Sequence, residues 1–281
     1  MKEEVKPDPR LRPLWDAILE VYKVFAAICD KHGLRYCADT GTTLGAIRHK
    51  GFIPWDDDMD MQMPRPDYDK FVELVQKELP KGLAWVDRFN CQGFTLPFGK
   101  VVVTDREVIR KVSECARMEL NDGIFVDVFP LDGYPDGLLA AKWRDVQDFL
   151  LNCRLRYFRG LRGCRRLRSI VAWLMGATLF AYNVRTDRDK SDFYERRARR
   201  YPFGKTRRCV SIGLAAAYDD KPYPFKFFGA PKTVSFENVT IPVQEDYDGY
   251  LKAMFGNYME LPPPETRHST HDHHRLAPWL V

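Results

Sequence analysis

The acidic segment GFIPWDDDMDMQM, residues 51–63, constrains the fold more than any other feature of this sequence. Four of five consecutive positions are aspartates, and the residues around them are large and apolar. The aspartates are Asp56, Asp57, Asp58 and Asp60. Alternate side chains of an extended strand share one face, so Asp56, Asp58 and Asp60 are expected to project together. The segment therefore predicts a strand with one face in the core and the other in a site.

Carboxylates crowded in this way need a partner that offsets their charge. They repel one another where the dielectric constant is low, and a divalent cation removes that conflict. Hard oxygen ligands suit Mg²⁺ or Mn²⁺. A solvated acidic turn is the simpler interpretation of an acid run, but apolar neighbours such as Trp55 and Met59 favour a metal site.

A further acid interrupts the apolar stretch Ile124–Phe129, which is rich in β-branched residues and reads as a strand. A buried carboxylate without a partner is costly, so Asp127 is expected to face a cleft, a cation or a basic side chain. An ion pair inside the structure is the alternative. Asp132 follows this stretch and is expected in a turn.

The turn Asp39–Gly45 precedes the acidic segment and leads into a short predicted helix. Backbone N–H groups at a helix N-terminus bind anions, and Gly41 lets a phosphate approach closely. Such a turn is common and weak evidence alone. Beside two sources of carboxylates, however, it completes the parts of a metal-assisted phosphoryl-transfer site.

The remaining pattern predicts a mixed α+β fold: a catalytic core with a helical insertion or lobe. We divide the chain into a core (1–135), a basic helical region (136–210) and a C-terminal part that returns to the core (211–281). Helices are expected at 13–32 (ending near Gly33), 67–79 and 246–256, with strands at 34–38, 60–63, 101–103, 124–128 and 233–236.

Composition narrows the class of protein. Seven cysteines without a CxxC pair argue against a disulfide framework or a structural zinc knuckle and favour a reducing compartment. The charged N-terminal residues carry no secretory signal pattern. The longest apolar stretch, Ser169–Val184, has about 16 residues, and a membrane span needs roughly 20. These features predict a cytoplasmic protein, with peripheral contact at the inner membrane face left open.

Several blocks of the sequence resemble the LicD family of phosphotransferases, whose core signature fukutin-related transferases share. The blocks follow the family's order from about residue 34 to residue 271. They are DTGTTLGAIRHKGFIPWDDDMDMQMPRPDYDKF, FGKVVVTD, FVDVFPLDGYP and GNYMELPPPETRHSTH. The resemblance implies a nucleotidyltransferase-like core. It also implies transfer of phosphocholine, or a related phospho-alcohol such as ribitol phosphate, from a CDP-activated donor to a glycan, as in cell-surface glycan modification.

The same resemblance assigns roles to individual residues. It implies Asp58 and Asp60 as metal carboxylates, Asp56 as an accessory acid and Asp127 as the third carboxylate. Gly41 and Thr42 match the phosphate-binding turn. Further residues expected to contact the donor phosphates are Arg48, Lys50, Lys100, Arg267 and His268, although a mobile polar terminus explains the last two equally well. Asp127 either completes the metal shell or takes the proton of the acceptor hydroxyl.

A quaternary ammonium group is bound by aromatic faces through cation–π contact. Tyr36, Phe52 and Trp55 are candidates because they lie near the predicted site in sequence, and core packing is the alternative for each.

The region 154–168 carries seven arginines and no acid, directly before the apolar stretch 169–184. This arrangement suits an anionic membrane surface and a lipid-linked glycan acceptor. A solvated helix face is the alternative. Nucleic acid is disfavoured as a partner because no recognisable binding module is present.

Three other functions remain open from the sequence. A nucleotidyltransferase uses the same metals, but the acceptor attacks a different phosphorus of the donor. A glycosyltransferase of the DxD type also presents paired aspartates, and the Gly41–Thr42 turn and Asp127 argue mildly against it. A silent scaffold is disfavoured by the complete carboxylate set.

Overall fold

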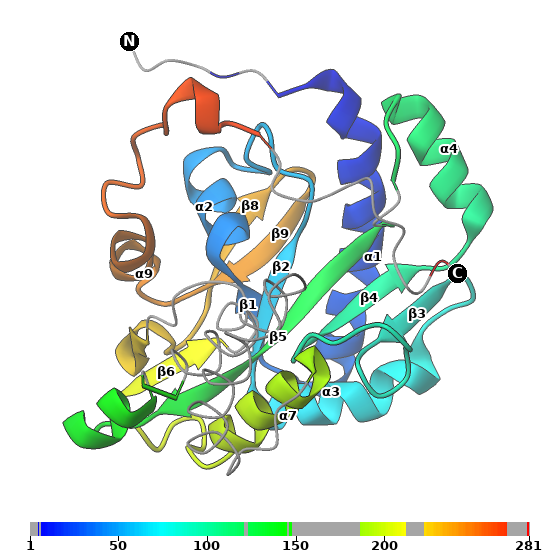
Figure 1. The fold of residues 1–281 in the computed structure, drawn as a ribbon. Coiled ribbons are helices and arrows are strands. Elements are labelled where there is room, and N and C mark those ends of the chain that lie inside the picture. The colour runs from blue at the N-terminus through cyan, green and yellow to red at the C-terminus, as the bar shows by residue number, and fades with distance from the viewer. Residues whose placement is uncertain are drawn as a thin grey trace, which may run out of the picture.

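The computed structural model describes residues 5, 7–120, 123–144, 146–147, 186–211, 222–268 and 280. Within them one mixed sheet carries the fold, and helices cover it (Figure 1). The strands of this sheet are β1 (Cys37–Ala38), β2 (Asp60–Pro64), β3 (Leu83–Val86), β4 (Gly99–Val103), β5 (Phe125–Tyr134), β6 (Arg208–Ser211) and β7 (Tyr223–Pro224). A separate hairpin joins β8 (Lys232–Phe236) to β9 (Val239–Val243). The helices are α1 (Arg12–His32), α2 (Thr40–Arg48), α3 (Arg65–Glu78), α4 (Arg106–Ala116), α7 (Asp187–Ala198) and α9 (Tyr247–Phe255). The α+β class is confirmed.

The long strand β5 organises the sheet. It runs parallel to β2 on one side, and on the other it pairs antiparallel first with β4 and then with β6. The order across the sheet is β1-β2-β5-β4-β3. Pro130 has no N–H to donate, and it falls between the end of the β4 pairing at Val128 and the start of the β6 pairing at Leu131. The strand therefore continues through this proline.

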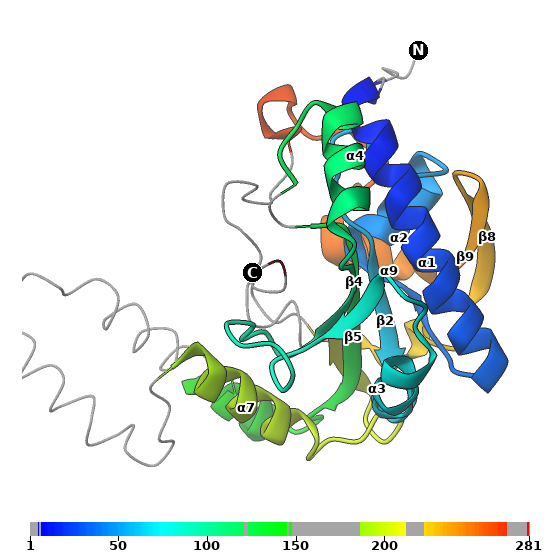
Figure 2. The same cartoon turned by 90° about the vertical axis from the view of Figure 1, so that its right-hand side faces the viewer.

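Helix α1 provides most of the apolar cover on one face of the sheet (Figure 2). Its apolar side chains recur at helical spacing, Pro13 stands in its first turn, and Gly33 ends it in the left-handed region at φ 61°. Trp15 stacks on Phe52 with ring centroids 5.0 Å apart, and Phe52 also contacts Phe236 of β8. Each large apolar side chain buried in this way stabilises the fold by about 1.5–3 kcal/mol. The layer holds the acidic loop that precedes β2.

Most of the predicted elements are confirmed, with shifted ends. Helices 13–32, 67–79 and 246–256 correspond to α1, α3 and α9. The predicted strand 34–38 is reduced to two residues, Cys37–Ala38. The expectation that Asp132 lies in a turn is wrong, because β5 extends to Tyr134. The elements β3, α4, β6, β7 and β9 were not predicted, and β6 lies in the region 136–210 that was expected to be helical.

Part of the basic helical region lies outside the described residues. The seven arginines of 154–168 and the apolar stretch 169–184 fall there, so their membrane role stays a prediction. In the described part of 136–210, helix α7 packs near β5, and strand β6 joins the main sheet. The division into three regions also stays a prediction. Among the described helices, none has the length and apolar character needed to cross a membrane.

Candidate active site

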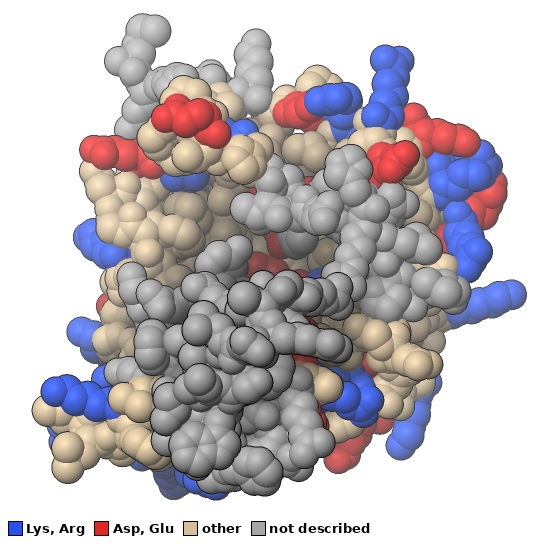
Figure 3. Space-filling view, in the orientation of Figure 1, with Lys and Arg blue, Asp and Glu red and all other residues tan. Residues whose placement is uncertain are grey.

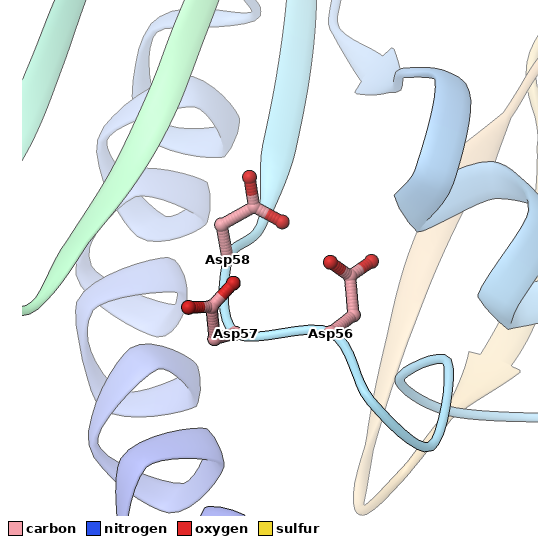
Figure 4. A group of neighbouring side chains, drawn as sticks. All are labelled: Asp56, Asp57 and Asp58. Carbon is pink, nitrogen blue, oxygen red and sulfur yellow. The ribbon is translucent and has the colours of Figure 1, made fainter. Parts of the chain in front are cut away.

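The acidic loop Asp56–Asp58 lies directly before β2 (Figure 4). The strand begins only at Asp60, so the prediction that Asp56, Asp58 and Asp60 share one strand face is wrong. Their alternation nevertheless persists in the loop, where Asp56 and Asp58 are partly exposed and Asp57 is buried. One carboxylate oxygen from each of Asp56, Asp57 and Asp58 lies within 4.8 Å of the others. Asp58 stands on the loop just before β2, and Asp56 stands on the side of α2.

Asp60 and Asp127 are neighbours on the parallel strands β2 and β5, at matching register positions. The N–H of Asp127 donates to the carbonyl of Met59 at 3.0 Å. The pKa of the Asp60 carboxyl is raised well above its ordinary value, first by burial and then by the charges of Asp58, Asp127, Asp39 and Asp56. Asp58 and Asp127, the other two predicted metal carboxylates, therefore lie near Asp60. Asp39 and Asp56 are also close enough to raise its pKa. Figure 3 shows acidic atoms at the bottom of a hollow on this face.

Lys100 provides a positive charge within this group. It is the second residue of β4 rather than the residue before a strand, and it lies opposite Asp127 on β5. Its Nζ lies 2.5 Å from one Asp127 carboxylate oxygen and 2.8 Å from the other. The same Nζ lies 3.6 Å from the ring centroid of Phe125. The apolar ring limits water around the ion pair and strengthens its attraction.

The turn before α2 approaches the acids closely. A Cβ atom added at Gly41 would lie 3.3 Å from the Asp56 carboxylate, so a side chain here would press on that acid. The hydroxyl of Thr42 accepts a hydrogen bond from the N–H of Asp60 at 2.8 Å. Thr42 therefore fixes the start of β2 relative to α2, in addition to its predicted place in the phosphate turn.

Asp39 is a site residue that the sequence analysis did not assign. It is fully buried, it caps α2 by accepting from the N–H of Thr40 at 2.8 Å, and Tyr250 of α9 donates a short hydrogen bond to it. Burial raises the pKa of its carboxyl, and the hydrogen bonds from Tyr250 and Thr40 oppose that rise. An aspartate at a helix N-cap was the signal in the sequence. Nothing local indicated Tyr250.

Two predicted phosphate ligands lie at the other end of α2. Arg48 donates to the carbonyls of Tyr258 and Glu260 at 2.8 and 3.1 Å, and so holds the chain after α9. Lys50 is exposed, with φ 63°, and its carbonyl accepts from the N–H of Glu237. The hydrogen bonds of the Arg48 side chain therefore go to His49 and to the chain after α9, and not to the acids of the site.

Trp55, Arg267 and His268 come together at a separate cavity of about 520 Å³, which Asp57 also lines. The other two predicted aromatic ligands are elsewhere. Phe52 is buried in the core, and Tyr36 packs edge-on against Phe25, with centroids 5.0 Å apart. Of the three rings, only Trp55 lines this cavity.

Comparison with known proteins finds a matching domain over the residues of this site. Residues 33–141 match the model of the LicD/FKTN/FKRP nucleotidyltransferase domain, which contains every carboxylate described above. The chain is similar to the lipopolysaccharide cholinephosphotransferase LicD of Haemophilus influenzae, with 26% identity over 268 residues that cover 90% of this chain and 92% of that protein. It is also similar to an uncharacterized protein of Rickettsia prowazekii, with 26% identity over 121 residues that cover 43% of this chain and 41% of that protein. The domain match and the similarity along nearly the whole chain both support a LicD family phosphotransferase.

Proposed function

We propose that this chain transfers a phospho-alcohol, phosphocholine before others, from a CDP-linked donor to a glycan hydroxyl and releases CMP. The observation that carries the proposal is the gathering of Asp58, Asp60 and Asp127 beside the first turn of α2. Acids placed together next to a helix N-terminus suit a cation that grips a diphosphate.

The donor set fits Mg²⁺ or Mn²⁺. It consists of carboxylate oxygens, which these hard cations prefer. The raised pKa of Asp60, caused by burial and by four neighbouring acids, is relieved by a positive charge among them. Asp58 and Asp60 would hold the cation, with Asp56 as an accessory ligand and Asp127 beside them. When bound, the cation neutralises charge on the diphosphate and on the CMP leaving group.

The remaining chemistry belongs to the chain itself. Backbone N–H groups of Gly41 and Thr42 lie in the first turn of α2, where they orient phosphate oxygens. Lys100, held by Asp127, keeps a positive charge at the floor of the site. Asp127 either binds the cation or accepts the proton of the attacking hydroxyl.

The identity of the group transferred is supported by the relative from Haemophilus influenzae, whose name states cholinephosphotransferase activity on lipopolysaccharide. The similarity extends over 90% of this chain, which includes the C-terminal elements that pack against α2. We therefore place phosphocholine first and a lipid-linked or surface glycan as the acceptor.

A donor screen tests the proposal. The purified chain is incubated with lipopolysaccharide and CDP-choline, CDP-ribitol, CDP-glycerol or CDP-ethanolamine, with and without Mg²⁺, and nucleotide products are measured. We expect Mg²⁺-dependent CMP release that is greatest with CDP-choline. No CMP release with any donor would refute the proposal.

A nucleotidyltransferase is the second candidate, because the matched domain carries that description. The two activities differ in the phosphorus that is attacked. Release of pyrophosphate from CTP or another triphosphate, without CMP release from the CDP-linked donors, would favour this alternative.

A further inference from the structure

The cavity of about 520 Å³ adjoins the proposed metal ligands without belonging to them. Trp55 and Asp57 of the acidic loop form one wall, and Arg267 and His268 of the C-terminal part contribute another. An Asp57 carboxylate oxygen lies within 4.8 Å of ligand oxygens of both Asp56 and Asp58. A molecule bound in this cavity would therefore contact Asp57, whose carboxylate adjoins those of the proposed diphosphate site.

The cavity lining carries charges of both signs: Asp8 and Asp57 are acidic, and Arg10 and Arg267 are basic. Arg267 lines the cavity, and Arg48 is close enough for Arg267 to lower its pKa, after the larger effect of burial. A trimethylammonium group has neither a hydrogen-bond donor nor an acceptor, so it would leave both the acids and the guanidinium groups without a hydrogen bond. The occupant should instead offer hydrogen-bond acceptors to the basic residues.

The face of Trp55 accepts a flat group. The guanidinium carbon of Arg267 lies 6.0 Å from the centroid of this ring, and the tryptophan is partly exposed. Bases stack on such rings whatever their sequence. Asp57, buried in the same wall, presents a carboxylate, which accepts a hydrogen bond from the exocyclic amino group of cytosine but not from the carbonyl of uracil.

These features together match one ligand class. Resting on the proposed CDP-linked donor, we infer that this cavity binds the cytosine ring of the nucleotide. Trp55 stacks on the base, Asp57 accepts from its amino group, and Arg267 and His268 donate to its O2 and N3. The cavity then selects the nucleotide, and the phospho-alcohol is recognised elsewhere.

Calorimetric titration tests this assignment with CMP, UMP and choline as probes, each with and without Mg²⁺. The wild-type chain should bind CMP more tightly than UMP. Trp55→Leu should weaken CMP binding about fivefold or more, as expected for loss of a stacking partner. Asp57→Asn should lower the CMP-to-UMP affinity ratio about tenfold, since a hydrogen bond to a charged group is lost. The control Trp143→Leu removes an exposed tryptophan, 56% accessible, and should change neither value.

Other results overturn the inference. Absence of CMP binding by the wild-type chain would do so, as would Trp55→Leu with unchanged CMP affinity or with weakened choline binding alone. Trp55→Phe keeps an aromatic face and should retain most of the affinity, which separates stacking from loss of folding. CMP binding without transfer from any donor would remove the proposed function and leave the cytosine site intact. Transfer from a CDP-linked donor without preference for CMP over UMP would keep the proposed function and remove the cytosine site.

Discussion

Two aspartates of β5 lie five positions apart and are both buried, yet they have opposite surroundings. Asp132 is 1% exposed and receives Arg65 in a bidentate pair, with nitrogen–oxygen distances of 3.0 and 2.6 Å. Asp127 is 5% exposed and is paired with Lys100, but it also faces the acid Asp60 across the sheet. One carboxylate belongs to a network of alternating charges, and the other belongs to a cluster of acids.

The wider neighbourhoods repeat this difference. Around Asp132, Arg65 also approaches Glu195, which in turn contacts Arg88 and Arg199. Around Asp127, the acids named above raise the pKa of Asp60 after burial does. A buried carboxylate that the fold pairs with its own arginines, as Arg65 pairs with Asp132, has a structural role. Acids placed together against their mutual repulsion indicate a cation supplied from outside.

The largest expected effect is on catalysis. Asp60→Asn should reduce transfer about a thousandfold, because a metal ion contributes several kcal/mol of transition-state stabilisation. The fold should be retained, since the substitution removes repulsion rather than a partner. CMP release and circular dichroism measure the two quantities. Near-normal transfer would contradict the contrast between the clusters.

The mirror experiment is Asp132→Asn, which should act on stability. Leaving buried Arg65 without its carboxylate is expected to lower the free energy of unfolding by about 3–5 kcal/mol, measured by urea denaturation. Asp69→Asn is the matched control, because the pair of Asp69 with Arg199 is exposed and is worth about 1 kcal/mol or less. An equal loss in the free energy of unfolding for both variants would show that the buried pair is worth no more than the exposed one.

Asp127→Asn decides how far the acidic cluster extends. We expect the Mg²⁺ concentration for half-maximal activity to rise about tenfold or more, as for a lost metal contact. Unchanged Mg²⁺ dependence, together with loss of the acidic limb of the pH–rate profile, would assign Asp127 as the general base instead.

Tyr250→Phe tests a third arrangement, a buried acid held by neutral donors. Asp39 would lose a hydrogen bond at a fully buried position, so the free energy of unfolding should fall by about 1–3 kcal/mol. Tyr258→Phe removes an equivalent bond, to the half-exposed Asp248, and should cost less. Equal losses in the free energy of unfolding for the two variants, measured by denaturant titration, would show that burial of Asp39 does not strengthen its hydrogen bond.

The smallest effect concerns a side chain that gives up its charge. Burial and the neighbouring Arg48 lower the pKa of His49 from 6.5 to about 4. A basic group with a lowered pKa in the folded state contributes stability that is complete above its unfolded value and is lost as pH falls from 6.5 through about 4. Replacement by Gln should therefore flatten the pH dependence of unfolding in this window. A variant whose curve matches the wild type over pH 4–7 would speak against it.

Local sequence patterns predicted much of the fold and many of the site residues. The periodicity of α1, the glycine that ends it and the acids of the Asp56–Asp60 segment were readable directly, because each depends on neighbours a few positions away. The same reasoning misplaced Asp132, since Pro130 is a strand-ending signal unless a gap in the pairing accommodates it. It also treated the acid run as a strand, although only Asp60 belongs to β2.

The sequence by itself determined where the acids lie, where α1, α3 and α9 form and which family the chain resembles. Only the tertiary structure decided which acids meet a cation and which meet one another. The parallel register of β2 and β5 sets Asp60 beside Asp127, and α9 brings Tyr250 to Asp39 across 211 positions. Register follows from the burial of apolar strand faces against α1, and that long-range packing is not encoded in the spacing of any single segment.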